Sequence, residues 1–393
     1  MSSKGWEELL TGTSIKGGFW RKGCKHSSVT TPIAVNGLIL SLIKISSMVT
    51  LISKVGFRGF GNVLVQGQRI SYIEENAVQS MDNFKLHWTY EYTASPYWLH
   101  GFDKYILFQE KDEKEIVVLD WNGQRKMTLP GRYYLFGSVA GDGHLLLRER
   151  DGDEWRWVKL YKDLHLEPSG VEGAIGNISI YRRFLIDRFT LLTCWDMEKK
   201  VCVWQRDMTR YRIYRQFSQE VDGGVRAVYF EEDIVIAVCH EYLMAFNLTT
   251  GAPLWNKHFP AGGFYDWGFV NNGILFILGG SGHFRKIDIK TGDILLETRQ
   301  ELKCTHPVNG RATSLWSFHL TNVVDTGRYM AGSTKLHTFF FLIDKESGEL
   351  ADMGRLVEEY PEVRDPILFM DGKLYVLYMY RDRKELMAFN IDQ

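Results

Sequence analysis

The sequence predicts an all-β chain that forms a single closed β-propeller of four-stranded antiparallel blades. Two motifs recur along its 393 residues: a hairpin with a glycine turn, and a short polar turn followed by a very apolar strand. The composition agrees, because aromatic residues make up 14% of the chain and its 37 glycines outnumber its 9 prolines. Aromatic and β-branched runs between Gly, Asn and Asp residues are typical of strands joined by tight turns.

The hairpin motif is clearest in LMAFNLTTGAPLW, at 243–255. An apolar strand ends there, Thr250-Gly251 makes the turn, and a second strand begins with Leu254-Trp255. Glycine after a polar residue suits a tight turn that needs a positive φ angle. The motif returns at 284–296 and 339–351, and in weaker form at 116–127 and 191–204.

Three tryptophans, Trp88, Trp204 and Trp255, fall in the short strand that follows such a turn. A flat indole ring wedged between neighbouring sheets buries a large apolar area. We therefore interpret these residues as structural parts of the repeat.

The second motif lies upstream of each hairpin. Together the two motifs give a unit of four short strands, which we name A to D from the axis outward, and the apolar B strands suit sheets covered on both faces. Eight units are favoured, with seven as the alternative count, because unit spacings of this size are typical of propeller blades. Copies of the second motif occur at 55–65, 98–108, 133–147, 178–186, 226–238, 267–278, 316–332 and 367–378.

The two ends of the chain predict how the ring closes. The last unit stops at 385–393, which has a C strand and no D strand. A spare strand at 38–45 precedes the first unit, and its pairing with the last C strand would remove the exposed edges. The sequence thus divides into an extension at 1–34 and a propeller at 35–393. The apolar stretch at 38–52 contains Lys44 and is too short for a membrane-spanning helix, so we expect strands there and no membrane span.

The Thr-Gly turn followed by Leu-Trp resembles the repeat of the PQQ-like β-propellers, the quinoprotein and BamB type. The resemblance implies the same architecture over most of the chain. Quinoprotein dehydrogenases of that family use a quinone, a calcium ion, a catalytic Asp and a disulfide between adjacent cysteines. This sequence has no adjacent cysteine pair, so we expect neither that cofactor nor that activity. WD40 repeats fit less well, because no unit shows their Gly-His and Trp-Asp pair.

Searches for catalytic, metal and nucleic-acid signatures return nothing that predicts an enzyme. The close Cys/His pairs, Cys24-Lys25-His26 and Cys304-Thr305-His306, lack the further ligands that zinc needs. The net charge of −1 gives no broad basic surface for nucleic acid. Five cysteines without a CxxC motif favour a reducing compartment, and the first residues lack a signal peptide's apolar core, so a cytoplasmic location is expected.

Residues that enter the A strands are the candidates for binding, because the D–A connections and B–C turns line one face of a propeller. Trp, Tyr and Arg dominate the energetics of protein interfaces, which makes an aromatic and basic set at these positions informative. The candidates are Tyr97, Trp98, Tyr133, Tyr134, Arg182, Arg226, Tyr265, Trp267, Trp316 and Arg364.

Two functions stay open from the sequence. One is a non-catalytic interaction module, an adaptor, assembly factor or inhibitor of the immunity type, which as a monomeric ring binds a protein partner through this face. The other is an enzyme or small-molecule-binding propeller with its site in the central channel, where distant blades bring remote residues together.

Overall fold

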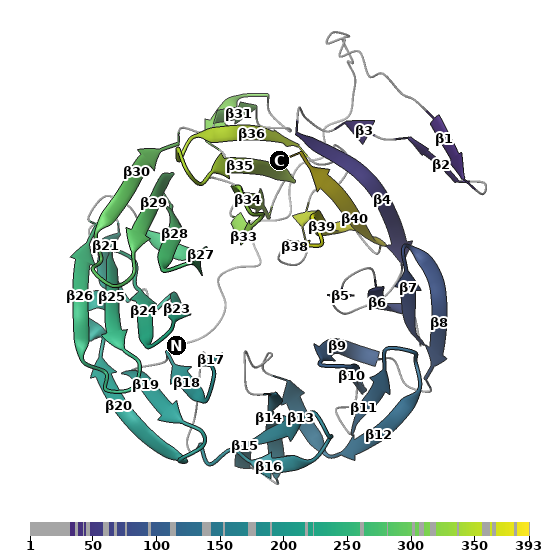
Figure 1. Cartoon of the computed structure of the whole chain (residues 1–393), viewed down its shortest axis with the longest axis horizontal. Coiled ribbons are helices and arrows are strands. Elements are labelled where there is room, and N and C mark those ends of the chain that lie inside the picture. Colours follow the sequence, from purple (N-terminus) through teal and green to yellow (C-terminus); the bar gives the residue numbers. More distant parts are fainter. Residues whose placement is uncertain are drawn as a thin grey trace, which may run out of the picture.

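The protein is a ring of β-sheets around a central opening (Figure 1). The computed structural model describes residues 32–35, 38–41, 43–44, 48–57, 63–66, 69–74, 77–92, 96–110, 115–135, 143–151, 154–171, 178–188, 191–216, 219–222, 224–259, 263–280, 282–300, 303–305, 310–314, 320–335, 338–355, 362–363, 367–380 and 383–392. The described strands form eight blades of four antiparallel strands, of which the last has its inner strand in two pieces and one more strand at its outer edge. This confirms the predicted all-β propeller and the higher of the two blade counts.

In each of blades 1 to 4 the strands pair in chain order from the axis outward. Blade 1 comprises β5 (Leu64–Gln66), β6 (Arg69–Glu74), β7 (Ala77–Asp82) and β8 (Lys85–Glu91). Blade 2 comprises β9 (Pro96–Phe102), β10 (Tyr105–Glu110), β11 (Glu115–Asp120) and β12 (Arg125–Pro130). Blade 3 comprises β13 (Arg132–Leu135), β14 (His144–Asp151), β15 (Glu154–Tyr161) and β16 (Leu166–Pro168). Blade 4 comprises β17 (Ile178–Tyr181), β18 (Phe184–Asp187), β19 (Leu191–Asp196) and β20 (Val201–Asp207).

Blades 5 to 8 continue the same order, and blade 8 takes its D strand from the start of the chain. Blade 5 comprises β23 (Ala227–Glu231), β24 (Ile234–Val238), β25 (Tyr242–Asn247) and β26 (Pro253–His258). Blade 6 comprises β27 (Phe264–Asn271), β28 (Ile274–Gly279), β29 (His283–Asp288) and β30 (Ile294–Arg299). Blade 7 comprises β33 (Leu320–Asp325), β34 (Tyr329–Thr334), β35 (Phe339–Asp344) and β36 (Leu350–Arg355). Blade 8 comprises β37 (Glu362–Val363), β38 (Leu368–Met370), β39 (Lys373–Tyr380), β40 (Arg383–Ile391) and β4 (Val49–Phe57), with β3 (Ile43–Lys44) at its outer edge.

The core of the ring consists of apolar clusters, each at a junction between two adjacent blades. The B and C strands together carry most of this burial, and every residue of the B strands β18 and β34 is buried. Such strands are apolar on both faces because a neighbouring blade covers each face. The apolar B strands of the second motif therefore lie where the repeat predicted.

Ring closure by an N-terminal strand is confirmed, but the strand differs from the predicted one. The closing strand is β4, which pairs along its length with the last C strand, β40. The predicted strand at 38–45 does not do this: β2 (Leu38–Ser41) pairs with β1 (Pro32–Val35) in a separate sheet, and β3 lies outside β4. The longer β4 matches the length of β40.

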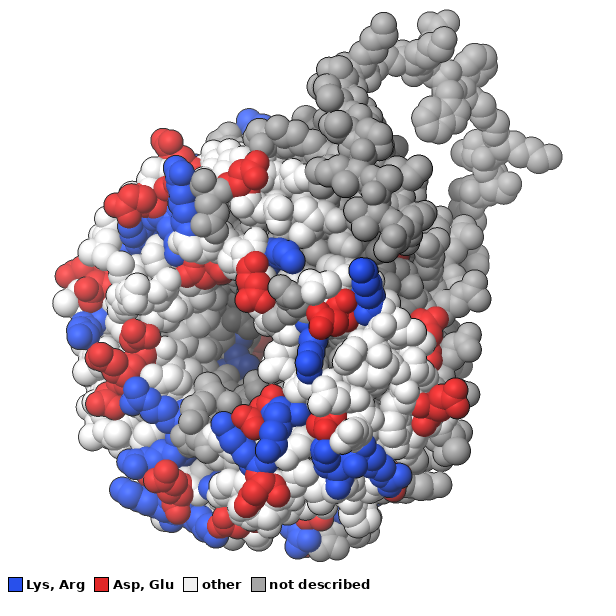
Figure 2. Space-filling view, turned by 45° about the vertical axis from the view of Figure 1, so that its right-hand side comes forward, with Lys and Arg blue, Asp and Glu red and all other residues white. Residues whose placement is uncertain are grey.

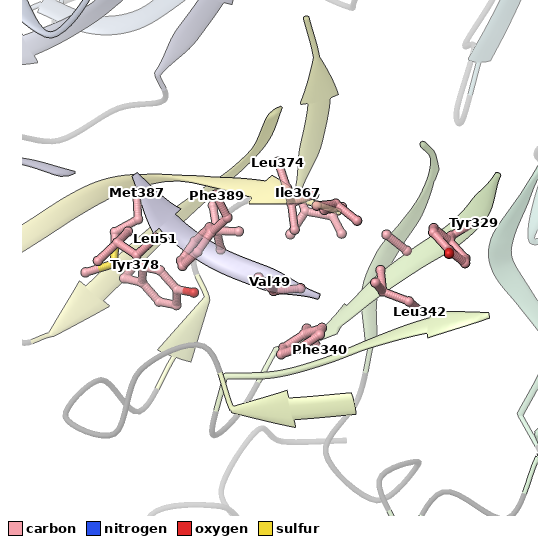
Figure 3. Close-up of a cluster of buried hydrophobic side chains, with 13 residues drawn as sticks. Val49, Leu51, Tyr329, Phe340, Leu342, Ile367, Leu374, Tyr378, Met387 and Phe389 are labelled. Carbon is pink, nitrogen blue, oxygen red and sulfur yellow. The ribbon is translucent and has the colours of Figure 1, made fainter. Parts of the chain in front are cut away.

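The same strand contributes buried side chains to the core at the closure, which explains why β4 pairs with β40 and residues 38–45 do not. Val49 is fully buried and Leu51 nearly so, both in the cluster between blades 7 and 8. Figure 3 shows these two side chains among Tyr378, Met387 and Phe389 of blade 8, facing Phe340 and Leu342 of blade 7. Burial of such side chains stabilises the closed ring by about 1.5–3 kcal/mol each.

The motif copy at 55–65 was assigned to the wrong strands. We predicted an A–B hairpin there, but Val55 to Phe57 end β4, and Leu64 begins β5, the first A strand. The A–B hairpin of blade 1 lies further along, where Val65 pairs with Ile70. Glycine and apolar residues alternate in both segments, so the local pattern could not separate them.

The hairpin motif depends on a residue that the sequence analysis overlooked. The turn between β25 and β26 begins with Asn247, whose Oδ1 accepts hydrogen bonds from the main-chain N–H groups of Thr249 and Thr250. Asp288 and Asp344 do the same in the next two blades. An Asx side chain that caps its own turn favours that turn strongly. The repeat is therefore an Asx-Gly motif rather than a Thr-Gly motif.

Candidate functional site

Among the described residues, the two faces of the ring differ in the length of the connections between strands. In a meander of antiparallel strands the A–B and C–D turns lie at one end, and the B–C turns and D–A connections at the other. Within the residues that the structure describes, two D–A connections contain extra hairpins. The connection at 208–226 contains α1 (Thr209–Arg212), β21 (Ile213–Gln216) and β22 (Gln219–Asp222), and the other contains β31 (Lys303–Thr305) and β32 (Ala312–Ser314). Both belong to the D–A face, one before blade 5 and the other after blade 6 along the chain.

The predicted face residues fall into several environments. For four of them the structure describes the strand but not the side chain: Tyr97 and Trp98 in β9, Tyr134 in β13, and Tyr265 in β27. Trp316 and Arg364 lie outside the described residues. Trp267 in β27 is half-buried and packs against the cluster between blades 6 and 7.

Tyr133 belongs to the core rather than to an open surface. Its side chain is 3% exposed in the cluster between blades 2 and 3. Its hydroxyl donates a hydrogen bond to Glu149 Oε1 at 2.9 Å, and its carbonyl accepts one from Gln109 Nε2 at 2.5 Å. Burial, followed by the Glu149 contact, raises the pKa of Tyr133 to about 12.

Arg182 lies on the opposite face from the one we predicted. It is an exposed residue of the turn between β17 and β18, which is an A–B turn, with φ of 52°. Its guanidinium lies over the ring of Tyr181, 5.0 Å from the centroid, and that ring stacks on Phe230. The sequence placed Arg182 at the entrance of an A strand, whereas it follows the end of that strand.

Arg226 does enter an A strand, and it lies in a group of arginines at the junction of blades 4 and 5. Its main-chain N–H donates to Val238 O, and its carbonyl accepts a hydrogen bond from Arg188 Nη1, each at 2.7 Å. Arg212, at the end of α1, pairs with Asp222 of β22 at 2.5 Å. Arg188 thus comes from blade 4, whereas Arg212 and Arg226 belong to the connection that precedes blade 5.

The B–C turn of blade 5 passes through this group. Burial raises the pKa of the Cys239 thiol to about 12, and the nearby charges of Arg212, Asp222 and Arg226 modify that shift. Burial also lowers the pKa of His240, and Arg226 lowers it further against the opposing effect of Glu241. At neutral pH the Cys239 thiol is therefore protonated and does not supply a nucleophilic thiolate.

A row of aromatic rings connects the inserted segment to blade 5. Tyr211 of α1 meets Tyr242 edge to face with ring centroids 5.2 Å apart, and Tyr242 stacks on His258 at 4.4 Å. His258 Nε2 lies 3.5 Å from Glu241 Oε2, so a carboxylate faces the end of the row. Edge-to-face and stacked pairs of this kind hold rings in fixed positions.

Arg285 of blade 6 is buried beside this group, next to Phe259 at the end of blade 5. Its side chain is almost fully buried, its guanidinium lies 4.6 Å from the Phe259 ring centroid, and its Nη2 bonds Glu297 Oε1 at 2.7 Å. His283 Nδ1 lies 3.1 Å from the same carboxylate oxygen. This is a guanidinium that binds a carboxylate against an aromatic face, a pairing favoured by its planar fork of donors.

We call this set the arginine–aromatic surface, and the sequence analysis found only one of its members. The available signal was the length of the connection at 208–226, far longer than that between β26 and β27. The surface is made of Arg188, Tyr211, Arg212, Arg226, His240, Tyr242 and His258, and Arg285 is buried beside it.

The rest of the described surface carries balanced charge. Figure 2 shows the ring hollowed at its centre, with acidic and basic side chains interspersed around the rim. Basic side chains gather over the lower part of the ring, where blades 2 and 3 lie, and several are paired there, as Lys126 is with Asp120 and Arg156 with Glu149. Among the described residues no group of three His, Cys, Asp or Glu residues could hold a metal ion. No helix in the described part of the chain is both long and apolar enough to cross a membrane.

Comparison with known proteins supports the fold only. No protein-family profile and no curated protein matches the sequence. Among solved structures, BamB from Moraxella catarrhalis superposes with a TM-score of 0.59 at 12% identity, covering 87% of this chain and 100% of that one. The computationally designed Ika8 protein gives 0.54 at 11%, covering 86% and 98%. Sqt1 from Saccharomyces cerevisiae gives 0.56 at 10%, covering 86% and 96%.

At these identities the likeness shows the architecture and not the activity. The resemblance to the PQQ-like propellers inferred from the repeat thus has a structural counterpart in BamB. The chain is an eight-bladed β-propeller.

Proposed function

We propose that the protein is a non-catalytic interaction module that binds a protein partner through the arginine–aromatic surface. The observation that carries this is the placement of extra chain: two inserted hairpins belong to the D–A face, one in the connection before blade 5 and one in the connection after blade 6. From the first of these segments, arginine, tyrosine and histidine side chains continue in fixed contacts onto blades 5 and 6. These residue types contribute most of the binding energy at protein interfaces, above all when their positions are set in advance.

The same proposal places the protein in a reducing compartment, the cytoplasm, as a monomeric ring. Support comes from the four cysteines within the described residues, Cys194, Cys202, Cys239 and Cys304, all of which are free thiols. Disulfides persist mainly in oxidising compartments.

The test is capture of partners from the native host, with tagged wild-type protein and two variants as bait. Tyr211→Ala removes a ring from the face, while Tyr181→Ala removes a ring from the opposite, A–B end. We expect wild type and Tyr181→Ala to retain a stoichiometric protein that Tyr211→Ala loses, with all three baits melting cooperatively.

Equal retention by both variants would contradict the proposed face. Co-purification of a small molecule without any protein would favour the second candidate function, a ligand site in the central channel.

A further inference from the structure

The inserted connection at 208–226 has a net positive charge, whereas the whole chain does not. It holds Arg210, Arg212, Arg215 and Arg226 against two carboxylates, Glu220 and Asp222, whereas the whole protein has a net charge of −1. This inserted connection therefore carries a local excess of positive charge. A local excess of this kind selects partners by charge complementarity.

The fold brings further basic groups to this connection. Arg188 approaches from the end of the B strand of blade 4 and donates to the carbonyl of Arg226. Arg212 is held by Asp222, and its side chain is only 11% exposed. Guanidinium groups that are partly removed from water interact more strongly with an incoming anion than exposed ones do, because the local dielectric constant is lower.

Aromatic rings border the arginines on the side of blade 5. The guanidinium of Arg210 lies over Tyr211, 5.9 Å from its centroid, and Tyr211 leads through Tyr242 to His258. An arginine beside flat rings receives a carboxylate in a defined orientation. The molecule already contains one such arrangement, since Arg285 binds Glu297 against the ring of Phe259.

We propose that the segment of the partner that enters the arginine–aromatic surface is an acidic peptide segment, whose Asp or Glu carboxylates bind Arg188, Arg212 and Arg226. This inference rests on the proposed protein-binding function and specifies its chemistry. Arginine suits it because the planar fork of N–H groups matches a carboxylate in two parallel bonds.

A peptide fits this surface better than a nucleic acid does. The carboxylates of Asp222, Glu241 and Glu297 lie among the arginines and rings. A polyphosphate backbone requires a continuous basic track and would meet these acidic groups. Carboxylates spaced along a peptide can each bind one arginine and leave the protein's own acidic groups in water.

The experiment measures binding of two fluorescent peptides of equal length to the full-length protein, one of alternating Glu and Ala and the other of alternating Gln and Ala. We expect the Glu peptide to bind at least about tenfold more tightly, with a difference that shrinks between about 50 and about 200 mM salt. Arg212→Gln should weaken the Glu peptide about tenfold, since a charge-assisted bond is lost. Arg212→Lys should weaken it less, because the charge stays and the fork does not.

Arg182→Gln is the matched control, because it removes an exposed arginine from the A–B end of the ring. Equal affinity for the two peptides, an equal loss in Arg182→Gln, or stronger competition by poly-dT than by the Glu peptide would each overturn the inference. If Arg212→Gln lowers the melting temperature, Arg188→Gln provides a second, independent measurement of the loss of affinity for the Glu peptide.

Capture of the partner from the host distinguishes a failure of this inference from a failure of the protein-binding function on which it rests. If Tyr211→Ala loses that partner while Arg212→Gln and excess Glu peptide have no effect, the acidic segment is wrong and the binding face stands. If Tyr211→Ala and Arg212→Gln both retain it, the proposed face fails as well.

Discussion

The indole N–H of Trp255 donates a hydrogen bond to the main-chain carbonyl of Ile289 in the next blade, at 2.8 Å. Trp255 lies in β26, the outer strand of blade 5, and Ile289 in the turn that follows β29 of blade 6. The relationship repeats between Trp204 and Leu248 at 2.8 Å. It also repeats between Trp88 and Trp121 at 3.0 Å. The three repeat tryptophans thus each link their own blade to the following one.

Replacing Trp255 by Phe should lower the free energy of unfolding by about 1–2 kcal/mol, because it keeps most of the ring but leaves the Ile289 carbonyl without its donor. Denaturant unfolding measures this. Leu254→Ala is the control in the same strand: Leu254 is 46% exposed, and its truncation should change stability by less than about 0.5 kcal/mol. A Phe variant as stable as wild type would show that the hydrogen bond contributes nothing.

The ring of Trp255 also requires the glycine beneath it. A Cβ on Gly292 would lie 2.6 Å from Trp255 Cδ2, and Gly292 has φ of +73°. Gly273 has nearly the same φ, +74°, with nothing within 4 Å of its Cβ position. Gly273→Ala should therefore cost only the backbone strain of about 1–2 kcal/mol. Gly292→Ala should cost about 1–3 kcal/mol more, because the indole must move. Equal costs in thermal unfolding would rule out the contact.

Ring closure predicts an unequal effect of two truncations. Removing residues 1–57 deletes β4 and its buried Val49 and Leu51, which leaves β40 with an open edge. We expect loss of the cooperative melting transition and self-association of the truncated ring, both reversed by adding a peptide of residues 48–57. Removing 1–31 spares β4 and should leave the transition in place. A normal transition without β4 would refute closure by this strand.

His100, in the inner strand β9, is expected to make the stability of the fold sensitive to acid. Burial lowers its pKa from 6.5 to about 4. Below pH 6.5 the unfolded chain therefore binds a proton that the native state does not, so stability falls as the pH drops from 6.5 to about 4. The full loss is about 3 kcal/mol. His100→Gln should lose less stability than wild type between about pH 7 and about pH 4.5 in denaturant titrations, whereas parallel curves would show that His100 does not contribute.

Most of the fold could be predicted from the sequence because the information is local. The turn at Asn247 and Gly251 and the apolar strands before and after it are specified within a few residues, and the pattern recurs in other blades. The closing strand could not be chosen this way. Residues 38–45 and β4 are both apolar, and the choice depends on pairing with β40, hundreds of residues later.

The candidate site was much less accessible from the sequence. Tyr133 and Arg182 match the composition of an interface, yet one is buried between blades and the other lies on the opposite face. Arg226 meets Arg188 only because blades 4 and 5 are adjacent, and it lies beside Cys239 because strands β23 and β24 of blade 5 pair. Neither contact follows from a pattern within a few residues.

The sequence by itself determined the repeat, the β-structure and the existence of an N-terminal closing strand, and it favoured eight blades over seven, since each follows from hydrophobic period and turn chemistry within short segments. Only the tertiary structure decided which strand closes the ring, which tryptophan meets which carbonyl, and which arginines share a surface. These depend on contacts between blades, where packing area and hydrogen-bond geometry select one partner among several segments of similar local pattern.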